Sequence, residues 1–241
     1  MSNHVIIMGC GRSGTSIFGE FFEHLEEYTY FSEPPFDDLI ELDYSRPIAA
    51  KVPRESKQFS PDDGLSVSVS KLKEVVPEPR SIFWIVRHPL DAICSLKVGI
   101  AKNWGHHPRP KNWEAWLEKP LVEQCAYHWN YINSIGYEKI QNHVQTVRFE
   151  NMILDPLTFA QNICLLGKID IESNFDNISA WCNRVQNSNN NQFKEAKTSQ
   201  AYSTKDHSVR VERWKENLSD KEIEMIRPLV LETANKFGYT F

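Results

Sequence analysis

The chain has 241 residues, 41% of them hydrophobic, which is enough for one globular domain with a sizeable core. Its formal net charge of -5 argues against nucleic acid or an anionic membrane as a partner, so a local cluster of positive charge must hold any bound anion. No apolar segment approaches the ~20 residues of a membrane span. The length and the absence of a domain linker predict a single domain over residues 1–241. The scattered cysteines and the absence of a signal peptide lead us to expect it in the cytoplasm, and the sequence leaves the oligomeric state open.

The N-terminal segment predicts the opening of a parallel α/β sheet. Residues 5–8 form a continuous apolar run, which is typical of a strand buried on both faces. Residues 9–15 are punctuated by glycine, and apolar residues at helical spacing follow from Ile17 to Leu25. A strand, a glycine-rich turn and a helix in this order begin many α/β folds.

Apolar periodicity and flanking proline or glycine predict the later elements. Strands are expected at residues 29–31, 81–86 and 144–149, and helices at 70–76, from Pro89 onward, at 121–140, at 156–166 and at 221–237. Residues 36–50 are assigned to helix or loop, and residues 55–68 and the polar tract 187–192 to loops. The tryptophan-rich segment 99–120 is long enough to suggest a functional loop.

Residues 9–16, with the sequence Gly-Cys-Gly-Arg-Ser-Gly-Thr-Ser, are a candidate anion-binding loop. Inward-facing backbone N–H groups and a helix N-terminus would both attract a negative charge there. The glycine spacing matches the nucleotide-triphosphatase loop, and Ser16 occupies its hydroxyl position, but Thr15 replaces the lysine that contacts the phosphates. The cation is instead Arg12, inside the loop. A tight turn with a chance arginine is the simpler interpretation.

Arg87 and Ser95 form a second candidate anion site. Arg87 follows the predicted strand 81–86, at the sheet edge where open α/β sheets bind ligands, and a guanidinium can grip a phosphate through two hydrogen bonds. Ser95 lies two turns into the next helix and offers a hydroxyl. A kinase would carry a magnesium-binding aspartate after such a strand. Surface arginines and helical serines are also common without any function.

Both motifs resemble those of the sulfotransferases that use 3′-phosphoadenosine-5′-phosphosulfate (PAPS). Residues 9–16 resemble the family's 5′-phosphosulfate loop, in the arginine-containing form of the bacterial and Golgi types, and Arg87-x7-Ser95 resembles its 3′-phosphate motif. The resemblance implies a P-loop-containing nucleotide-hydrolase-like α/β fold of three layers, with helices on both faces of a parallel sheet. It also implies PAPS as the sulfuryl donor and a set of residues that contact the phosphosulfate: Gly11, Arg12, Ser13, Gly14, Thr15 and Ser16.

Two further segments follow in the family's order. Residues 147–156 resemble a family strand–helix segment, with Phe149 where the family usually has tyrosine. Residues 208–219 resemble the C-terminal segment that closes over the cofactor, with two extra residues before Arg213. The resemblance therefore assigns Arg213 to the cofactor site and leaves the role of Ser208 open. Arg210, Arg213 and Lys215 would also fit a solvated face.

Sulfuryl transfer needs a base for the acceptor proton and cations for the charge on the sulfuryl and bridging oxygens. Glu33 follows the second predicted strand, about where related enzymes place a catalytic glutamate, and its apolar and proline neighbours would desolvate it. Lys51 resembles the lysine of the family's Lys-x-Pro segment and would stabilise the leaving phosphate. His106 and His107 are alternative bases. The sequence shows no cluster with metal-ligand spacing, so no metal is expected.

The acceptor is predicted to be a small molecule or a glycan. A carbohydrate hydroxyl is favoured because Trp104, Trp113 and Trp116 can stack on sugar rings, although the same residues fit core packing, and a lipid or another small metabolite is the next choice. Two other functions remain open. One is a P-loop kinase or nucleotide triphosphatase with a degenerate loop, and the other is a non-catalytic nucleotide- or glycan-binding protein of the same fold.

Overall fold

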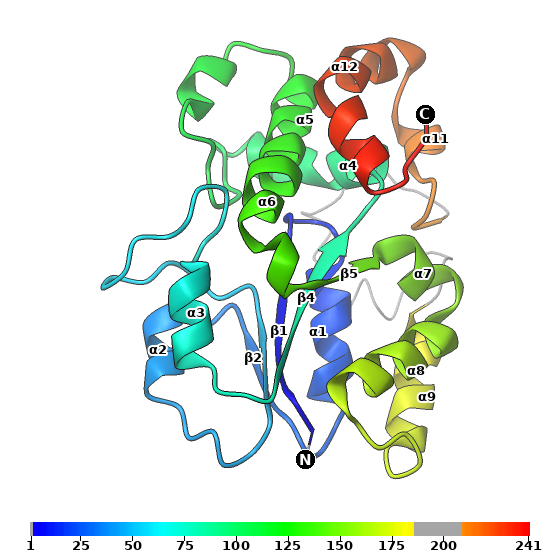
Figure 1. Ribbon diagram of the computed structural model, residues 1–241. Coiled ribbons are helices and arrows are strands. Elements are labelled where there is room, and N and C mark those ends of the chain that lie inside the picture. Colours follow the sequence, from blue (N-terminus) through cyan, green and yellow to red (C-terminus); the bar gives the residue numbers. More distant parts are fainter. Residues whose placement is uncertain (1, 186–208) are drawn as a thin grey trace.

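The computed structural model describes residues 2–185 and 209–241 (Figure 1). A five-stranded sheet, with every neighbouring pair parallel, has the order β2-β3-β1-β4-β5. Its strands are β1 (His4–Gly9), β2 (Thr29–Ser32), β3 (Ile48–Lys51), β4 (Arg80–Val86) and β5 (Gln145–Arg148). The predicted loop at 187–192 and Ser208 lie outside the described residues.

Helices cover both faces of the sheet, which confirms the predicted three-layer α/β fold. Alternate residues of β1 face opposite cores: Val5 and Ile7 enter one, Ile6 and Met8 the other. The first core also receives α1 (Thr15–Glu23), α7 (Phe149–Leu154), α8 (Pro156–Gly167) and α9 (Phe175–Arg184). The second receives α2 (Phe36–Ile40), α3 (Val69–Val75), α4 (Pro89–Ile100), α5 (Leu121–Tyr131), α6 (Tyr137–Ile140) and α12 (Asp220–Lys236), with α11 (Trp214–Asn217) packed against it.

The main departure from the predicted elements is β3, which lies in a segment assigned to helix or loop. Its four residues are fully buried and pair with β1 on one side and β2 on the other. No element was predicted at α9. Pairing with a neighbour on each side stabilises β3, whereas α9 buries Ile178 and Trp181, three residues apart on one face, a short helical pattern that the prediction missed. No helix within residues 2–185 and 209–241 has the length and apolar character needed to cross a membrane.

The predicted helix 121–140 is interrupted by a π-helical turn at Ile132–Gly136 between α5 and α6. At this turn the backbone of Gly136 packs directly against Gly64, in the long loop that follows β3. A Cβ atom at Gly136 would lie 2.3 Å from the Gly64 carbonyl oxygen, and one at Gly64 would lie 2.5 Å from the Gly136 nitrogen. The contact therefore requires glycine on both sides and ties the loop to the helix.

Candidate functional site

The anion-binding loop lies between β1 and α1, at the carboxyl edge of the sheet (Figure 1). Gly14 has a left-handed φ of 95°, and a Cβ atom there would lie 2.4 Å from a ring carbon of Phe149, so both conformation and space require glycine. The hydroxyl of Ser13 is buried and has no hydrogen-bond partner among the described residues. An orphaned polar group inside a loop of this kind fits a bound anion.

Arg87 leaves the end of β4 and links the anion loop to the C-terminal segment. Its Nη1 donates to the Arg12 carbonyl oxygen at 3.2 Å, and its Nη2 donates to the Arg210 carbonyl oxygen at 2.6 Å. The guanidinium carbon lies 4.1 Å from the centroid of the Phe149 ring. A guanidinium has five N–H donors, and the buried Nε of Arg87 has no partner among the described residues, so hydrogen-bonding capacity remains for a phosphate.

Arg213 completes the second candidate anion site. Its Nη1 donates to the hydroxyl of Ser95 at 2.9 Å, so the structure brings together two residues that lie far apart in the sequence. Arg213 is 4% exposed and Arg210 is 7% exposed, so the solvated-face interpretation is wrong for both and holds only for the exposed Lys215. Burial and the nearby charge of Arg87 lower the pKa of each buried arginine to about 10.

A buried carboxylate anchors the segment that carries these arginines. Asp91, in the first turn of α4, accepts hydrogen bonds from the backbone nitrogens of Glu212 at 2.8 Å and Trp214 at 3.0 Å. Burial raises the pKa of Asp91. Sequence reasoning missed this anchor and left Arg210 out of the site, because the alternation of basic and polar residues in the segment looks the same on a buried and a solvated surface.

Glu33 and Lys51 meet because β2 and β3 are neighbours. Ser32 pairs with Lys51 in the sheet register, and the Glu33 nitrogen donates to the Lys51 carbonyl oxygen at 2.8 Å. The Lys51 Nζ lies 2.6 Å from a carboxylate oxygen of Glu33 and 3.3 Å from the hydroxyl of Ser16. The Lys51 side chain is 3% exposed, so a buried cation connects the candidate base to the anion loop.

The environment of Glu33 differs from the expected one. The predicted desolvation is wrong, because its side chain is 56% exposed despite the prolines that follow. Glu33 has a left-handed φ of 54°, and its carbonyl oxygen accepts a hydrogen bond from Arg54 Nε at 2.7 Å. The backbone is therefore held in place while the carboxylate remains accessible from solvent.

The two alternative bases lie in different environments. His106 lies against the anion loop, where a Cβ atom at Gly11 would be 3.2 Å from the His106 Nδ1. Burial, together with the charge of Arg12, lowers the pKa of His106 to about 4. His107 is exposed. A histidine with so low a pKa is a weak base, which favours Glu33 among the candidates.

The three tryptophans predicted to contact a sugar all pack against protein groups. Trp104 is fully buried in the core. Trp116 stacks on Tyr127 with the ring centroids 4.0 Å apart, and the guanidinium of Arg109 lies 4.4 Å from the centroid of the Trp113 ring. Trp113 and Trp116 are only half-buried, so these two retain accessible surface.

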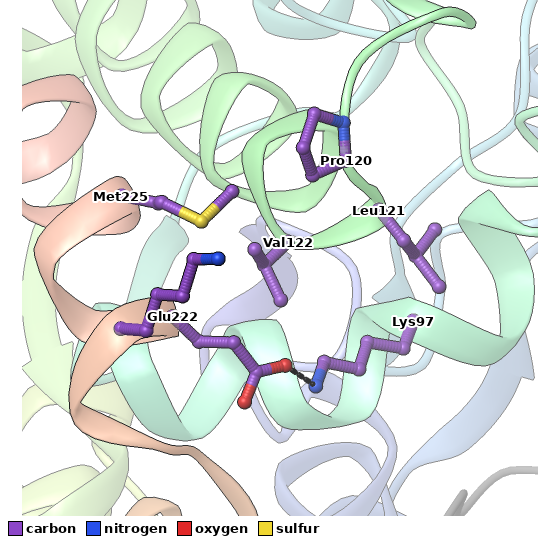
Figure 2. Close-up of a pocket in the computed structure, with 7 residues that line it drawn as sticks. Lys97, Pro120, Leu121, Val122, Glu222 and Met225 are labelled. Atoms are coloured by element: carbon purple, nitrogen blue, oxygen red, sulfur yellow. Dashed lines mark hydrogen bonds and ion pairs between the residues drawn. The ribbon is translucent and has the colours of Figure 1, made fainter.

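A pocket of about 330 Å³ lies elsewhere, between α4, the start of α5 and α12 (Figure 2). Val122 and Met225 contribute apolar surface, and Lys97 and Glu222 form an ion pair of 2.9 Å at its wall. None of the predicted site residues lines this pocket. It is therefore separate from the two anion sites.

Comparisons with known proteins agree with this fold. The family model of the sulfotransferase domain matches residues 2–238. The solved sulfotransferase domain from the curacin biosynthetic pathway is similar with a TM-score of 0.61 and 12% identity, over 100% of this chain and 99% of that one. Mouse sulfotransferase SULT7A1, complexed with PAP, has a TM-score of 0.59 and 16% identity, over 97% and 84% of the two chains.

A third structure, the sulfotransferase domain of the Synechococcus PCC 7002 olefin synthase, has a TM-score of 0.59 and 14% identity, over 100% and 97% of the two chains. At such low identities these structures show a common fold. No curated protein sequence matches the chain significantly.

Proposed function

Since the chain belongs to the sulfotransferase family, we propose that it transfers the sulfuryl group of PAPS to an acceptor hydroxyl and releases adenosine 3′,5′-bisphosphate (PAP). The observation that carries the proposal is the second anion site, because PAPS differs from ATP in its 3′-phosphate. Arg87, Ser95 and Arg213 converge there, beside the loop proposed for the 5′-phosphosulfate. The similar mouse enzyme is described as a complex with PAP, which supports the same ligand here.

The proposed contacts divide between the two anion sites. The backbone of residues 11–16, the Arg12 side chain and the Ser13 hydroxyl would hold the phosphosulfate, and Arg87, Ser95 and Arg213 would hold the 3′-phosphate. Arg210 joins the second group because it is buried beside Arg87. Several buried arginines close together repel one another, so a polyanion would relieve that repulsion.

The proposed chemistry assigns Glu33 as the base and Lys51 as the cation at the leaving group. The Glu33 carboxylate takes the proton of the acceptor hydroxyl while that oxygen forms a bond to sulfur. The bond between sulfur and the bridging phosphate oxygen breaks, and PAP leaves with the electron pair. Lys51, which contacts both Glu33 and Ser16, lies where it can neutralise the developing charge.

The proposed acceptor is a carbohydrate hydroxyl, supported by the accessible surface of Trp113 and Trp116 in segment 99–120. A lipid or another small metabolite is the alternative. We further propose a single domain over residues 1–241 that works in a reducing compartment such as the cytoplasm, supported by five cysteines that are all free.

Two measurements test the proposal. Calorimetry without magnesium should show that PAP binds at least about tenfold more tightly than AMP or ATP. A single charge-assisted hydrogen bond to the 3′-phosphate is enough for a difference of this size. Equal affinity for AMP and PAP would contradict the 3′-phosphate site.

Turnover of labelled PAPS against a panel of sugars, lipids and small alcohols should then identify the acceptor. Magnesium-dependent ATP turnover would support the kinase alternative, and PAP binding without any turnover would support a binding protein.

A further inference from the structure

His106 is wedged between the anion loop and helix α4. A Cβ atom at Gly11 would lie 3.2 Å from the His106 Nδ1, and a Cβ atom at Gly99 would lie 2.2 Å from its Nε2. The three heavy atoms nearest to such a Cβ at Gly99 all belong to the His106 ring. Two glycines from distant parts of the chain therefore leave room for one imidazole and for little else.

The turn that follows α4 fixes the position of this ring. Asn103 and Trp104 both adopt left-handed conformations, with φ of 51° and 52°. The Gly105 nitrogen donates to the Gly99 carbonyl oxygen at 2.8 Å, and the buried indole of Trp104 donates to the His128 Nδ1 at 3.2 Å. The chain is thus folded back so that the residue after Gly105 points at the anion loop.

The electrostatic surroundings keep the imidazole uncharged at neutral pH. Burial is the main cause of its low pKa, and the charges of Arg12 and His107 add to the effect while Glu33 opposes it. The ring of His128 lies 5.9 Å away on the other side, and burial also keeps its pKa low, at about 3. A neutral ring can support the loop without competing with Arg12 for the anion.

We propose that His106 is a positioning residue, whose imidazole braces residues 10–14 in the conformation that binds the phosphosulfate of PAPS. The proposal rests on the proposed function and adds to it a residue that acts through the loop rather than on the acceptor. His106 Nε2 is buried and has no hydrogen-bond partner among the described residues, so the ring acts mainly through its shape. This role also distinguishes His106 from a base, which would have to reach the acceptor.

The test is a double-mutant cycle between Gly99 and His106. In Gly99→Ala the added Cβ displaces the ring, although alanine suits a helix better than glycine by about 1 kcal/mol, so the protein should stay folded. We expect Gly99→Ala and His106→Ala each to weaken PAP binding about tenfold. The double variant should bind no worse than His106→Ala, because the clash is gone. Lys102→Ala, which alters an exposed side chain of the same turn, is the matched control and should leave the affinity unchanged.

Steady-state kinetics separate positioning from catalysis. His106→Ala should raise the KM for PAPS while kcat changes less than about threefold, whereas loss of a base lowers kcat. A lower kcat at unchanged KM would overturn the proposal, and so would a Gly99→Ala effect that is the same with and without His106. His106→Gln, whose planar amide is no larger than the imidazole, should restore part of the affinity.

Binding of inorganic pyrophosphate separates the role of His106 from the proposed function. A wild-type protein that binds pyrophosphate but not PAP would contradict the 3′-phosphate site, and the cycle could still be measured with pyrophosphate. If PAP binds and the cycle shows no coupling between Gly99 and His106, the proposed function stands and the role of His106 falls. A wild-type protein that binds neither ligand contradicts both.

Discussion

The two sides of the candidate site are built differently. On the side of β4 and α4, Arg87, Arg210 and Arg213 are all at most 7% exposed and are tied to backbone and side-chain groups. On the side of β2 and β3, Lys51 is buried but Glu33 is 56% exposed, and the exposed Lys111 pairs with Asp63 of the loop after β3. The first side is organised before any ligand arrives, which lowers the entropic cost of binding. The second side leaves the carboxylate of the proposed base open to solvent.

Glu33→Gln should produce the largest effect, because it removes the proposed base, which lies on the more exposed side of the site. Loss of the base lowers kcat by about 10²- to 10⁴-fold, while PAP affinity stays within about threefold, because a neutral amide leaves the groups of both anion sites unchanged. Glu55→Gln, an exposed carboxylate in the following loop, is the control. A Glu33→Gln enzyme with near wild-type turnover would remove Glu33 from the mechanism.

Arg213→Met should show that the buried side carries the affinity. Leaving a phosphate without its charged partner costs about 2–4 kcal/mol, a loss of about 30- to 900-fold in PAP affinity by calorimetry. AMP binding should change little, because AMP has no 3′-phosphate. Lys215→Met tests the same segment at an exposed position and should have no effect. Equal losses for AMP and PAP would show that Arg213 acts elsewhere.

Acid should destabilise the chain through the buried His128. Burial depresses its folded pKa to about 3, so its contribution to stability is present above the unfolded pKa of about 6.5 and is lost as the pH falls toward the folded value. Between about pH 7 and about pH 5, the contribution of His128 should lower the free energy of unfolding by about 2 kcal/mol. Denaturant unfolding should show a flatter pH profile in His128→Gln than in wild type, and an unchanged one in the exposed control His143→Gln.

Lys111→Ala should have the smallest effect. Its Nζ lies 2.8 Å from Asp63 and links segment 99–120 to the loop after β3, but its side chain is 78% exposed. The free energy of unfolding should fall by less than about 1 kcal/mol, and the difference should vanish at high salt. A larger loss that persists in salt would show that the acceptor side is as firmly organised as the arginine side.

Much of this architecture follows from local patterns. β1 and β4 are continuous apolar runs because both faces are buried, and the anion loop and Arg87 follow directly from the ends of these strands. β3 escaped prediction because its four residues include two alanines, which carry little strand preference, and its neighbours on both sides stabilise it.

The contacts between distant residues could not be predicted from one sequence. The pairing of Glu33 with Lys51 depends on β2 and β3 being neighbours in the sheet. Because β3 was not predicted, this pairing could not be predicted either. The burial of Arg210 depends on how the C-terminal segment crosses α4. The position of His106 depends on Gly99 and Gly11 both packing against its ring, although they lie far apart in the sequence.

The backbone contact between Gly64 and Gly136 leaves no space for a side chain on either residue, so the loop after β3 meets the π-helical turn main chain to main chain. The two sides of Gly64 are also linked to each other, because the buried Ser66 hydroxyl donates to the Pro53 carbonyl oxygen at 2.6 Å. A change in length on one side of Gly64 should therefore shift the other side as well. Gly64 should tolerate no side chain, because it has a φ of 77° and an added Cβ atom would lie 2.5 Å from the Gly136 nitrogen.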